Sequence, residues 1–170
     1  KLPPPRKKNF AKPSLEEQNI GLKKDSISSE DSNLIQKLNE KYANEYPNSE
    51  PFVVACEEER IKDIRRYIEI GKIDVNLSGK DSAGDNTTGL LAAIWEGSVY
   101  VVDFLLKVPS IDISITDADH WNVLHFALKT ENKNIDLIKL LLNYPSILKY
   151  NVINGKDKKD ETPLDYAMKL

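Results

Sequence analysis

Few residues of this 170-residue chain have the types and the spacing that catalysis requires. The sequence contains no phosphate-binding loop, no Gly-x-Gly-x-x-Gly turn, no His-Glu-x-x-His helix and no Gly-x-Ser-x-Gly elbow. Most acidic residues fall on predicted helix faces and turns, where water solvates them. A carboxylate pair in a cleft stays open as an alternative, but no feature of the sequence favours it. We therefore predict that the chain is not an enzyme and uses no cofactor.

The two histidines and the single cysteine do not form a metal site either. His120 has no second His or Cys at ligand spacing, so we predict no metal. The single Cys56 excludes an internal disulfide and favours a reducing, intracellular setting. Its place among apolar residues predicts a buried, inert thiol.

One unit recurs along the chain, and its clearest copy runs from Asp117 to Ala127 and on through the apolar stretch 135–142. Each copy has the pattern of a turn, a short helix, a loop and a second helix. The leading apolar residue of the short helix recurs with spacings of 38, 34 and 40 residues, at Phe52, Leu90, Leu124 and Leu164. A period of this length indicates a stack of repeats. The fourth copy ends after its first helix.

The unit resembles the ankyrin repeat, whose consensus includes Asp-x-x-Gly-x-Thr-Pro-Leu-His-x-Ala-Ala. Asp117, Leu124, His125 and Ala127 match it, whereas His120 replaces the glycine and Asn122-Val123 replaces Thr-Pro. The tetratricopeptide unit, a rival of similar period, lacks this turn. The resemblance covers residues 50–170. It implies an all-α ankyrin-repeat solenoid of stacked helix pairs with finger loops, about four repeats plus an N-terminal capping helix.

The resemblance and the composition together divide the chain into an arm and a repeat domain. Residues 1–31 are poor in apolar residues and broken by prolines, which predicts a flexible basic arm. Residues 32–46 are predicted to form a capping helix, with Ser32 or Ser29 as the N-cap at its start. The predicted repeats lie at about 49–80, 81–116, 117–156 and 157–170, with a long, mobile first finger at 77–87 and with Leu105 and Leu140 fully buried.

The resemblance also implies a partner site on the finger tips and the first helices. The variable surface positions of the family fall on both tryptophans and on several acids. The predicted partner-binding residues are Glu57, Glu58, Asp85, Trp95, Glu96, Asp119, Trp121 and Lys129. Core packing is not expected to explain the tryptophans, although one of them filling the space beneath a finger stays an alternative. His125 is expected to bond to the turn of the neighbouring repeat.

The charge distribution limits the class of partner. Residues 1–12 carry five positive charges and no acid, whereas residues 50–170 contain 20 acids and 15 bases. An acidic body binds nucleic acid poorly, because phosphate contacts supply most of that affinity. No apolar run approaches the roughly 18 residues of a membrane span. We predict a protein or peptide partner, no direct contact with nucleic acid or membrane, a monomeric chain, and a nuclear or cytoplasmic location.

Two functions follow from these observations. The first is a non-enzymatic interaction scaffold that binds a basic peptide segment on the concave face, since rings with acidic neighbours attract cations. A chromatin or regulatory complex is one setting, and a histone-tail-like ligand is one option. The second function is an ankyrin arm of a larger enzyme or complex that contacts its own chain.

Overall fold

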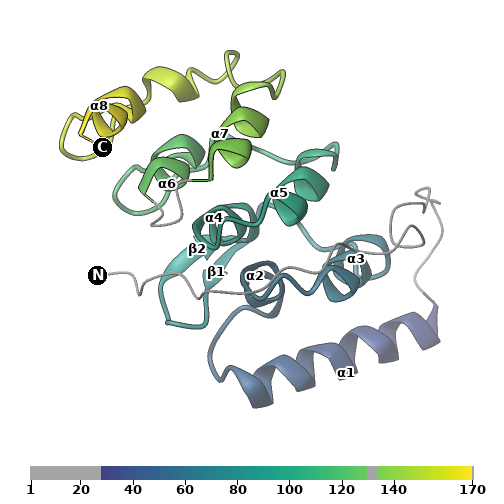
Figure 1. Cartoon of the computed structure of the whole chain (residues 1–170). Helices are drawn as coiled ribbons and strands as arrows, with labels where there is room; N and C mark the ends of the chain where they lie inside the picture. The colour runs from purple at the N-terminus through teal and green to yellow at the C-terminus, as the bar shows by residue number, and fades with distance from the viewer. Residues whose placement is uncertain (1–27, 130–133, 170) are drawn as a thin grey trace.

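The computed structural model describes residues 28–129 and 134–169. Paired antiparallel helices follow one another along this part of the chain, with one two-stranded hairpin (Figure 1). The elements are α1 (Ser29–Glu45), α2 (Pro51–Glu57), α3 (Ile61–Glu69), β1 (Ser78–Lys80), β2 (Asn86–Thr88), α4 (Gly89–Trp95), α5 (Val99–Leu106), α6 (Val123–Lys129), α7 (Ile135–Leu142), the 3-10 helix η2 (Val152–Asn154) and α8 (Pro163–Met168). The predicted arm lies outside the described residues, apart from its last four positions.

The helices form two rows, which confirms the predicted stack of helix pairs. The inner row consists of α2, α4, α6 and α8, each packed on the next, and the outer row contains α3, α5 and α7. Ala55, Ala93 and Ala127 stand at equivalent places of the inner row and have no exposed surface. A small residue there allows neighbouring inner helices to approach closely. We call the four units repeats one to four; they contain α2, α4, α6 and α8 in turn, and repeats two to four each include the finger turn that precedes that helix.

Three finger turns share one geometry, each anchored by an aspartate. Oδ1 of Asp117 accepts the N–H groups of Asp119 and Trp121 at 2.9 and 2.8 Å. Asp81 binds the N–H groups two and four residues ahead at 2.9 Å each, and Asp157 does so at 2.8 and 3.0 Å. The third residue after each aspartate has a positive φ, namely Gly84 at 91°, His120 at 63° and Asp160 at 65°. His120 therefore occupies the left-handed position that the consensus gives to glycine.

The first finger is a hairpin, in which β1 pairs with β2 and Gly79 lies opposite Thr87. Its mobility stays a prediction.

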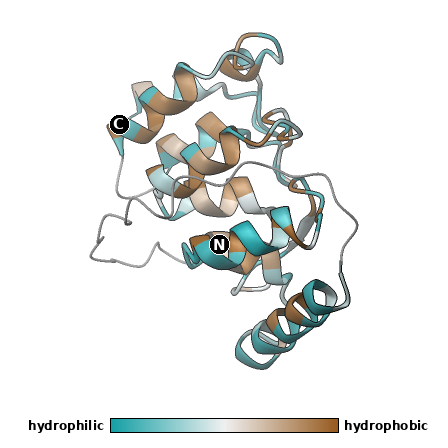
Figure 2. Cartoon of the chain, turned by 90° about the vertical axis from the view of Figure 1, so that its right-hand side faces the viewer, coloured by the Kyte–Doolittle hydropathy of each residue, from teal (hydrophilic) through white to brown (hydrophobic). Residues whose placement is uncertain are grey.

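The first helix covers repeat one, as a capping helix does. Leu38 and Tyr42 are 6% and 1% exposed, and the remainder of α1 is mostly hydrophilic (Figure 2). Buried Asp63 of α3 accepts hydrogen bonds from Tyr42 Oη at 3.1 Å and Lys41 Nζ at 3.0 Å. The helix begins at Ser29, and the predicted caps were wrong. Ser28 is the N-cap instead, in a capping box with Asp31.

The expectation of full burial is confirmed for Leu105, which is 0% exposed, but is wrong for Leu140, which is half-buried. In α7 the fully covered residues are Leu137 and Leu141, one turn apart. They define the core-facing side, and Leu140 lies about 100° away from Leu141 around the helix.

The last inner helix is covered on fewer sides than the others. Leu164 is 63% exposed, whereas its counterparts Phe52, Leu90 and Leu124 are at most 3% exposed. Met168 is also 71% exposed. No helix among residues 28–129 and 134–169 is both long enough and apolar enough to cross a membrane.

Candidate functional site

A pocket of about 490 Å³ lies between the finger turns and the inner helices. We call it the indole pocket, because both tryptophans of the chain line it. Its lining residues are Glu57, Asp81, Asp85, Asn86, Thr87, Ala92, Trp95, Glu96, Asp117, Ala118, Asp119, Trp121, Phe126, Lys129 and Lys159. They include seven of the eight predicted partner-binding residues. Partner binding itself stays a prediction.

Phe126 of α6 joins the two indoles. Its ring centroid lies 6.1 Å from that of Trp95 and 5.9 Å from that of Trp121, with interplanar angles of 77° and 83°. Edge-to-face contacts of this kind are favourable. Both tryptophans are half-buried. The expectation that core packing plays no part in their placement was therefore wrong, because each indole packs on Phe126 while it lines the pocket.

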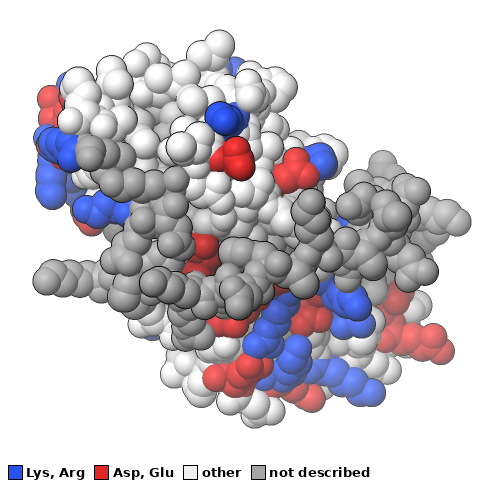
Figure 3. All heavy atoms as spheres, viewed as in Figure 1, with Lys and Arg blue, Asp and Glu red and all other residues white. Residues whose placement is uncertain are grey.

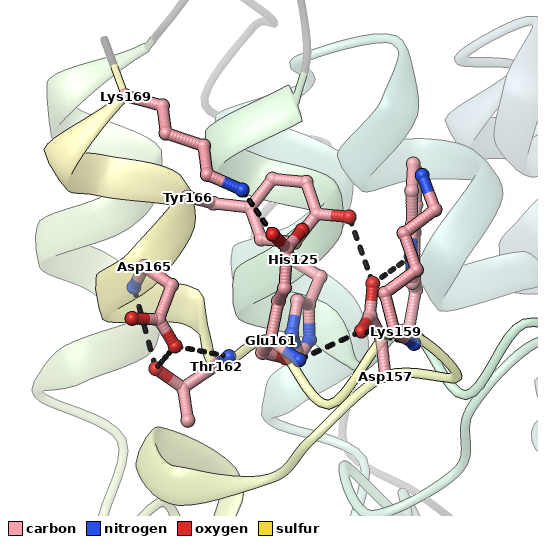
Figure 4. Close-up of polar contacts among 9 residues, drawn as sticks. His125, Asp157, Lys159, Glu161, Thr162, Asp165, Tyr166 and Lys169 are labelled. Carbon is pink, nitrogen blue, oxygen red and sulfur yellow. Dashed lines mark hydrogen bonds and ion pairs between the residues drawn. The ribbon is translucent and has the colours of Figure 1, made fainter.

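Trp121 is also bonded into repeat four, where Figure 4 shows Asp157 and Tyr166. Its Nε1–H donates to Oδ2 of Asp157 at 3.1 Å, and Tyr166 Oη donates to the same oxygen at 2.8 Å. The Tyr166 ring stands edge-on to Trp121 at 5.7 Å. Repeats three and four are thus joined by one carboxylate and two rings.

The hydrogen bonds at Asp157 control its charge. Burial raises the pKa of this carboxyl, but the donors around it outweigh burial and lower the pKa to about 2. These donors are the N–H groups of Glu161 and Lys159, Tyr166 Oη and Trp121 Nε1. The carboxylate is 6% exposed and stays ionised at neutral pH.

His125 supports the turn of repeat four from below and has no exposed surface. Its Nδ1 accepts the N–H of Asn122 at 3.2 Å, and its Nε2 lies 3.0 Å from the carbonyl oxygen of Glu161. These partners assign the proton to Nε2 of a neutral ring. The predicted bond to the neighbouring turn is confirmed. His125 holds the fold together and is not free for a metal or a substrate.

Sequence comparison identifies the units just described. The family described as "Ankyrin repeats (3 copies)" matches residues 90–170. These residues belong to the ankyrin-repeat family. Ankyrin repeats mediate protein–protein interactions, typically on the extended surface of the stack.

One curated relative is a much larger protein than this chain. The chain is 39% identical over 67 residues to "Palmitoyltransferase AKR1" of Lachancea kluyveri. That stretch covers 39% of this chain and 8% of the palmitoyltransferase. The chain therefore spans only a small part of this relative.

The predicted acids Glu57, Asp85 and Asp119, which line the indole pocket, differ in their contacts. Glu57 accepts hydrogen bonds from the backbone N–H of Ser82, at 2.9 Å, and from its hydroxyl, which ties α2 to the first finger. Asp119 lies 3.5 Å from Lys158. Asp85 is exposed at the first finger tip. These three carboxylates surround the rings from different repeats.

Two predicted acids lie elsewhere than expected. Glu96, at the C-cap of α4, is 8% exposed and is thus a largely covered part of the wall rather than a surface charge. Glu58 does not line the pocket. It is near Tyr46 at the end of α1, and burial together with Glu58 raises the pKa of the Tyr46 hydroxyl.

The lysines of the pocket come from repeats three and four. Lys129 Nζ lies 5.5 Å from the centre of the Trp121 ring and 6.0 Å from that of Tyr166. The chain thus places a cation of its own on this indole. Lys159 lines the same side, and Lys and Arg side chains gather at the edge where α8 lies (Figure 3).

Ala92 and Phe126 line the pocket but were not among the predicted surface positions, whereas Thr87 was one of the variable turn positions and was not selected as a partner-binding residue. Ala92, Phe126 and Tyr166 occupy the variable position of the Leu-His-x-Ala pattern in their repeats. An alanine where the two following repeats carry rings leaves space beside α4, which a comparison of the repeats could have found. Thr87 has a buried Oγ1 without a hydrogen-bond partner in the described part of the chain, and only a structure reveals that.

The described residues contain no cluster of three or more His, Cys, Asp or Glu that could hold a metal. Burial raises the pKa of the Cys56 thiol, which has no exposed surface. Its predicted burial is confirmed, and its inertness stays a prediction.

Proposed function

We propose that this chain is a non-enzymatic scaffold that binds a basic segment of a partner protein in the indole pocket. One observation carries the proposal: two indoles line a single pocket together with carboxylates from two successive finger turns, Asp85 and Asp119. A Lys or Arg side chain gains from the face of an indole and from nearby carboxylates at once. Tryptophan is also enriched among the residues that dominate protein interfaces.

The two indoles contribute differently to this function. Trp121 is bonded to Asp157 and covered by Lys129, so it serves mainly as a wall of the pocket. Trp95 stands at the end of α4 beside Ala92, next to the acids of repeats one and two. Because these acids lie beside it, we expect the cation of the partner to contact Trp95.

Binding can be measured without an added label, because the only two tryptophans of the chain line the pocket. Arg- and Lys-containing peptides should change the indole fluorescence, and higher salt should weaken their binding. Trp95→Ala should weaken binding more than tenfold, as judged with dye-labelled peptides, and should leave the fold intact. Tyr150→Ala is the matched control, because Tyr150 is 44% exposed and lies outside the pocket.

A second substitution tests the pocket by filling it. Ala92→Phe places a ring where repeats three and four already carry one. It should abolish peptide binding while the circular dichroism spectrum stays helical. Undiminished binding to both Trp95→Ala and Ala92→Phe would rule out this pocket as the site.

The likeness to part of a palmitoyltransferase favours a second candidate function. In it, the repeats act as an arm of a larger enzyme and contact that enzyme's own chain. The two functions differ in a measurable way. The scaffold binds separate basic peptides as an isolated chain, whereas the arm shows hydrogen-exchange protection of the pocket only within a longer parent protein.

A further inference from the structure

The charges that line the indole pocket are separated along the stack. Glu57, Asp81, Asp85 and Glu96 belong to repeats one and two, whereas Lys129 and Lys159 belong to repeats three and four. Asp117 and Asp119, in the turn of repeat three, lie between these groups, and Lys158 partly neutralises Asp119 at 3.5 Å. The pocket thus has an acidic side and a basic side, and a purely basic ligand matches only the first.

The two lysines of the basic side point to a ligand of their own. Within residues 28–129 and 134–169, neither Lys129 nor Lys159 forms an ion pair, although acids line the same pocket. Lys129 instead rests against two aromatic rings, which hold its ammonium group in place. An oriented ammonium group beside a partly covered pocket attracts an anion.

The acidic side holds an independent sign of a ligand. Thr87 lines the pocket and is 8% exposed, and its Oγ1 has no hydrogen-bond partner in the described part of the chain. A buried polar group without a partner is rare and costly. A guanidinium group carries several N–H donors, one of which can serve this oxygen while others reach Asp85.

We propose that the partner segment is bipolar, with an arginine on the acidic side and an Asp or Glu carboxylate that reaches Lys129 and Lys159. This inference rests on the proposed function and adds the anion and its place. Complementary charge at both ends fixes the register of the segment and weakens the binding of purely basic sequences. Lys129 is then a specificity-determining residue.

The stack also sets the spacing between the two charges. Neighbouring helices lie about 8–10 Å apart, so α4 lies one such step from α6 and two from α8. An extended chain advances about 3.3 Å per residue. The carboxylate should therefore stand about three to six residues from the arginine.

The test uses dye-labelled Gly/Ser peptides and fluorescence anisotropy with the whole chain. One probe carries Arg and Glu four residues apart, a second has Gln in place of Glu, and a third has Arg and Glu adjacent. The first probe should bind at least fivefold more tightly than the other two. Lys129→Glu combined with Lys159→Glu should reverse the preference, so that the Gln probe binds more tightly than the Glu probe.

Lys139→Glu is the matched control, because Lys139 is exposed on α7 and lies outside the pocket. It should leave the order of the three probes unchanged. Equal affinity for the Glu and Gln probes, unaltered by the double reversal, would overturn the bipolar ligand and leave the basic-peptide scaffold standing. If no Arg-containing probe binds at all, the proposed function itself fails.

Discussion

The turns at Asp81 and Asp157 have the same backbone and opposite electrostatics. In both, Oδ1 binds the N–H groups two and four residues ahead, and the third residue has a positive φ. Burial raises the pKa of Asp81 despite its backbone hydrogen bonds. At Asp157 the pKa falls to about 2, because Oδ2 also accepts hydrogen bonds from Trp121 and Tyr166.

This difference distinguishes the turn that each repeat's own sequence encodes from the hydrogen bonds that side chains of neighbouring repeats add. The aspartate of each finger makes the turn, and any copy of the motif provides that. The second oxygen of Asp157 is stabilised by side chains from two repeats. Asp157 therefore also links repeats three and four, and we call this link the joint. Asp81, by contrast, stands beside the pocket and lacks such donors within the described part of the chain, so its ionised form is less stabilised.

Substitution by asparagine should give the largest difference in the free energy of unfolding between the two turns. Asparagine keeps an oxygen for the turn but removes the charge. Asp157→Asn should lower the free energy of unfolding by about 2–3 kcal/mol, because hydrogen bonds from Trp121 and Tyr166 to a charged partner are lost. Asp81→Asn should change it by less than about 0.5 kcal/mol or raise it. Urea unfolding at pH 7 measures both, and equal losses would mean that the two turns do not differ as described.

The contributions of Asp157 and Asp81 to stability should change with pH in opposite directions. The pKa of Asp157 is lower in the folded state, so its stabilisation, about 2 kcal/mol, is complete above pH 4 and is lost as the pH falls towards 2. The stability gap between the wild type and Asp157→Asn should therefore close over that window. The pKa of Asp81 is higher in the folded state, so its charge costs stability as the pH rises past 4. The wild type should therefore become less stable relative to Asp81→Asn as the pH rises past 4. Denaturation at several pH values measures this difference.

The indole donor to Asp157 can be removed with Trp121→Phe. The substitution removes the Nε1–H bond to Asp157 and one of the two fused rings that pack against Phe126, while the Tyr166 bond to Asp157 remains. We expect a loss of at least about 0.5–1.5 kcal/mol from the hydrogen bond, to which the lost ring contacts add. Differential scanning calorimetry should detect it as a lower melting temperature. No loss here, combined with a large loss for Asp157→Asn, would assign the joint to Tyr166 alone.

The sequence was sufficient for the repeats, because the alanines, the leading apolar residues and the turn aspartates recur at fixed places. It was also sufficient to select seven of the fifteen residues that line the indole pocket. It could not predict that Glu96 is covered or that Glu58 lies near Tyr46, because each depends on how a side chain turns at the end of a short helix. The burial of Leu140 was predicted wrongly for a related reason. In a helix that is almost wholly apolar, residue type alone does not show which positions face the core.

The smallest effect on stability should come from Thr87, on the side of the pocket near Asp81. Thr87→Val replaces a hydroxyl that has no hydrogen-bond partner in the described part of the chain, in a strand where valine is favoured. The free energy of unfolding should stay the same or rise by up to about 1 kcal/mol. Affinity for an arginine peptide should nevertheless fall several-fold, because one acceptor of the guanidinium group is gone. A residue whose removal helps the fold and harms binding marks a binding site, whereas a parallel loss of stability and binding would make Thr87 merely structural.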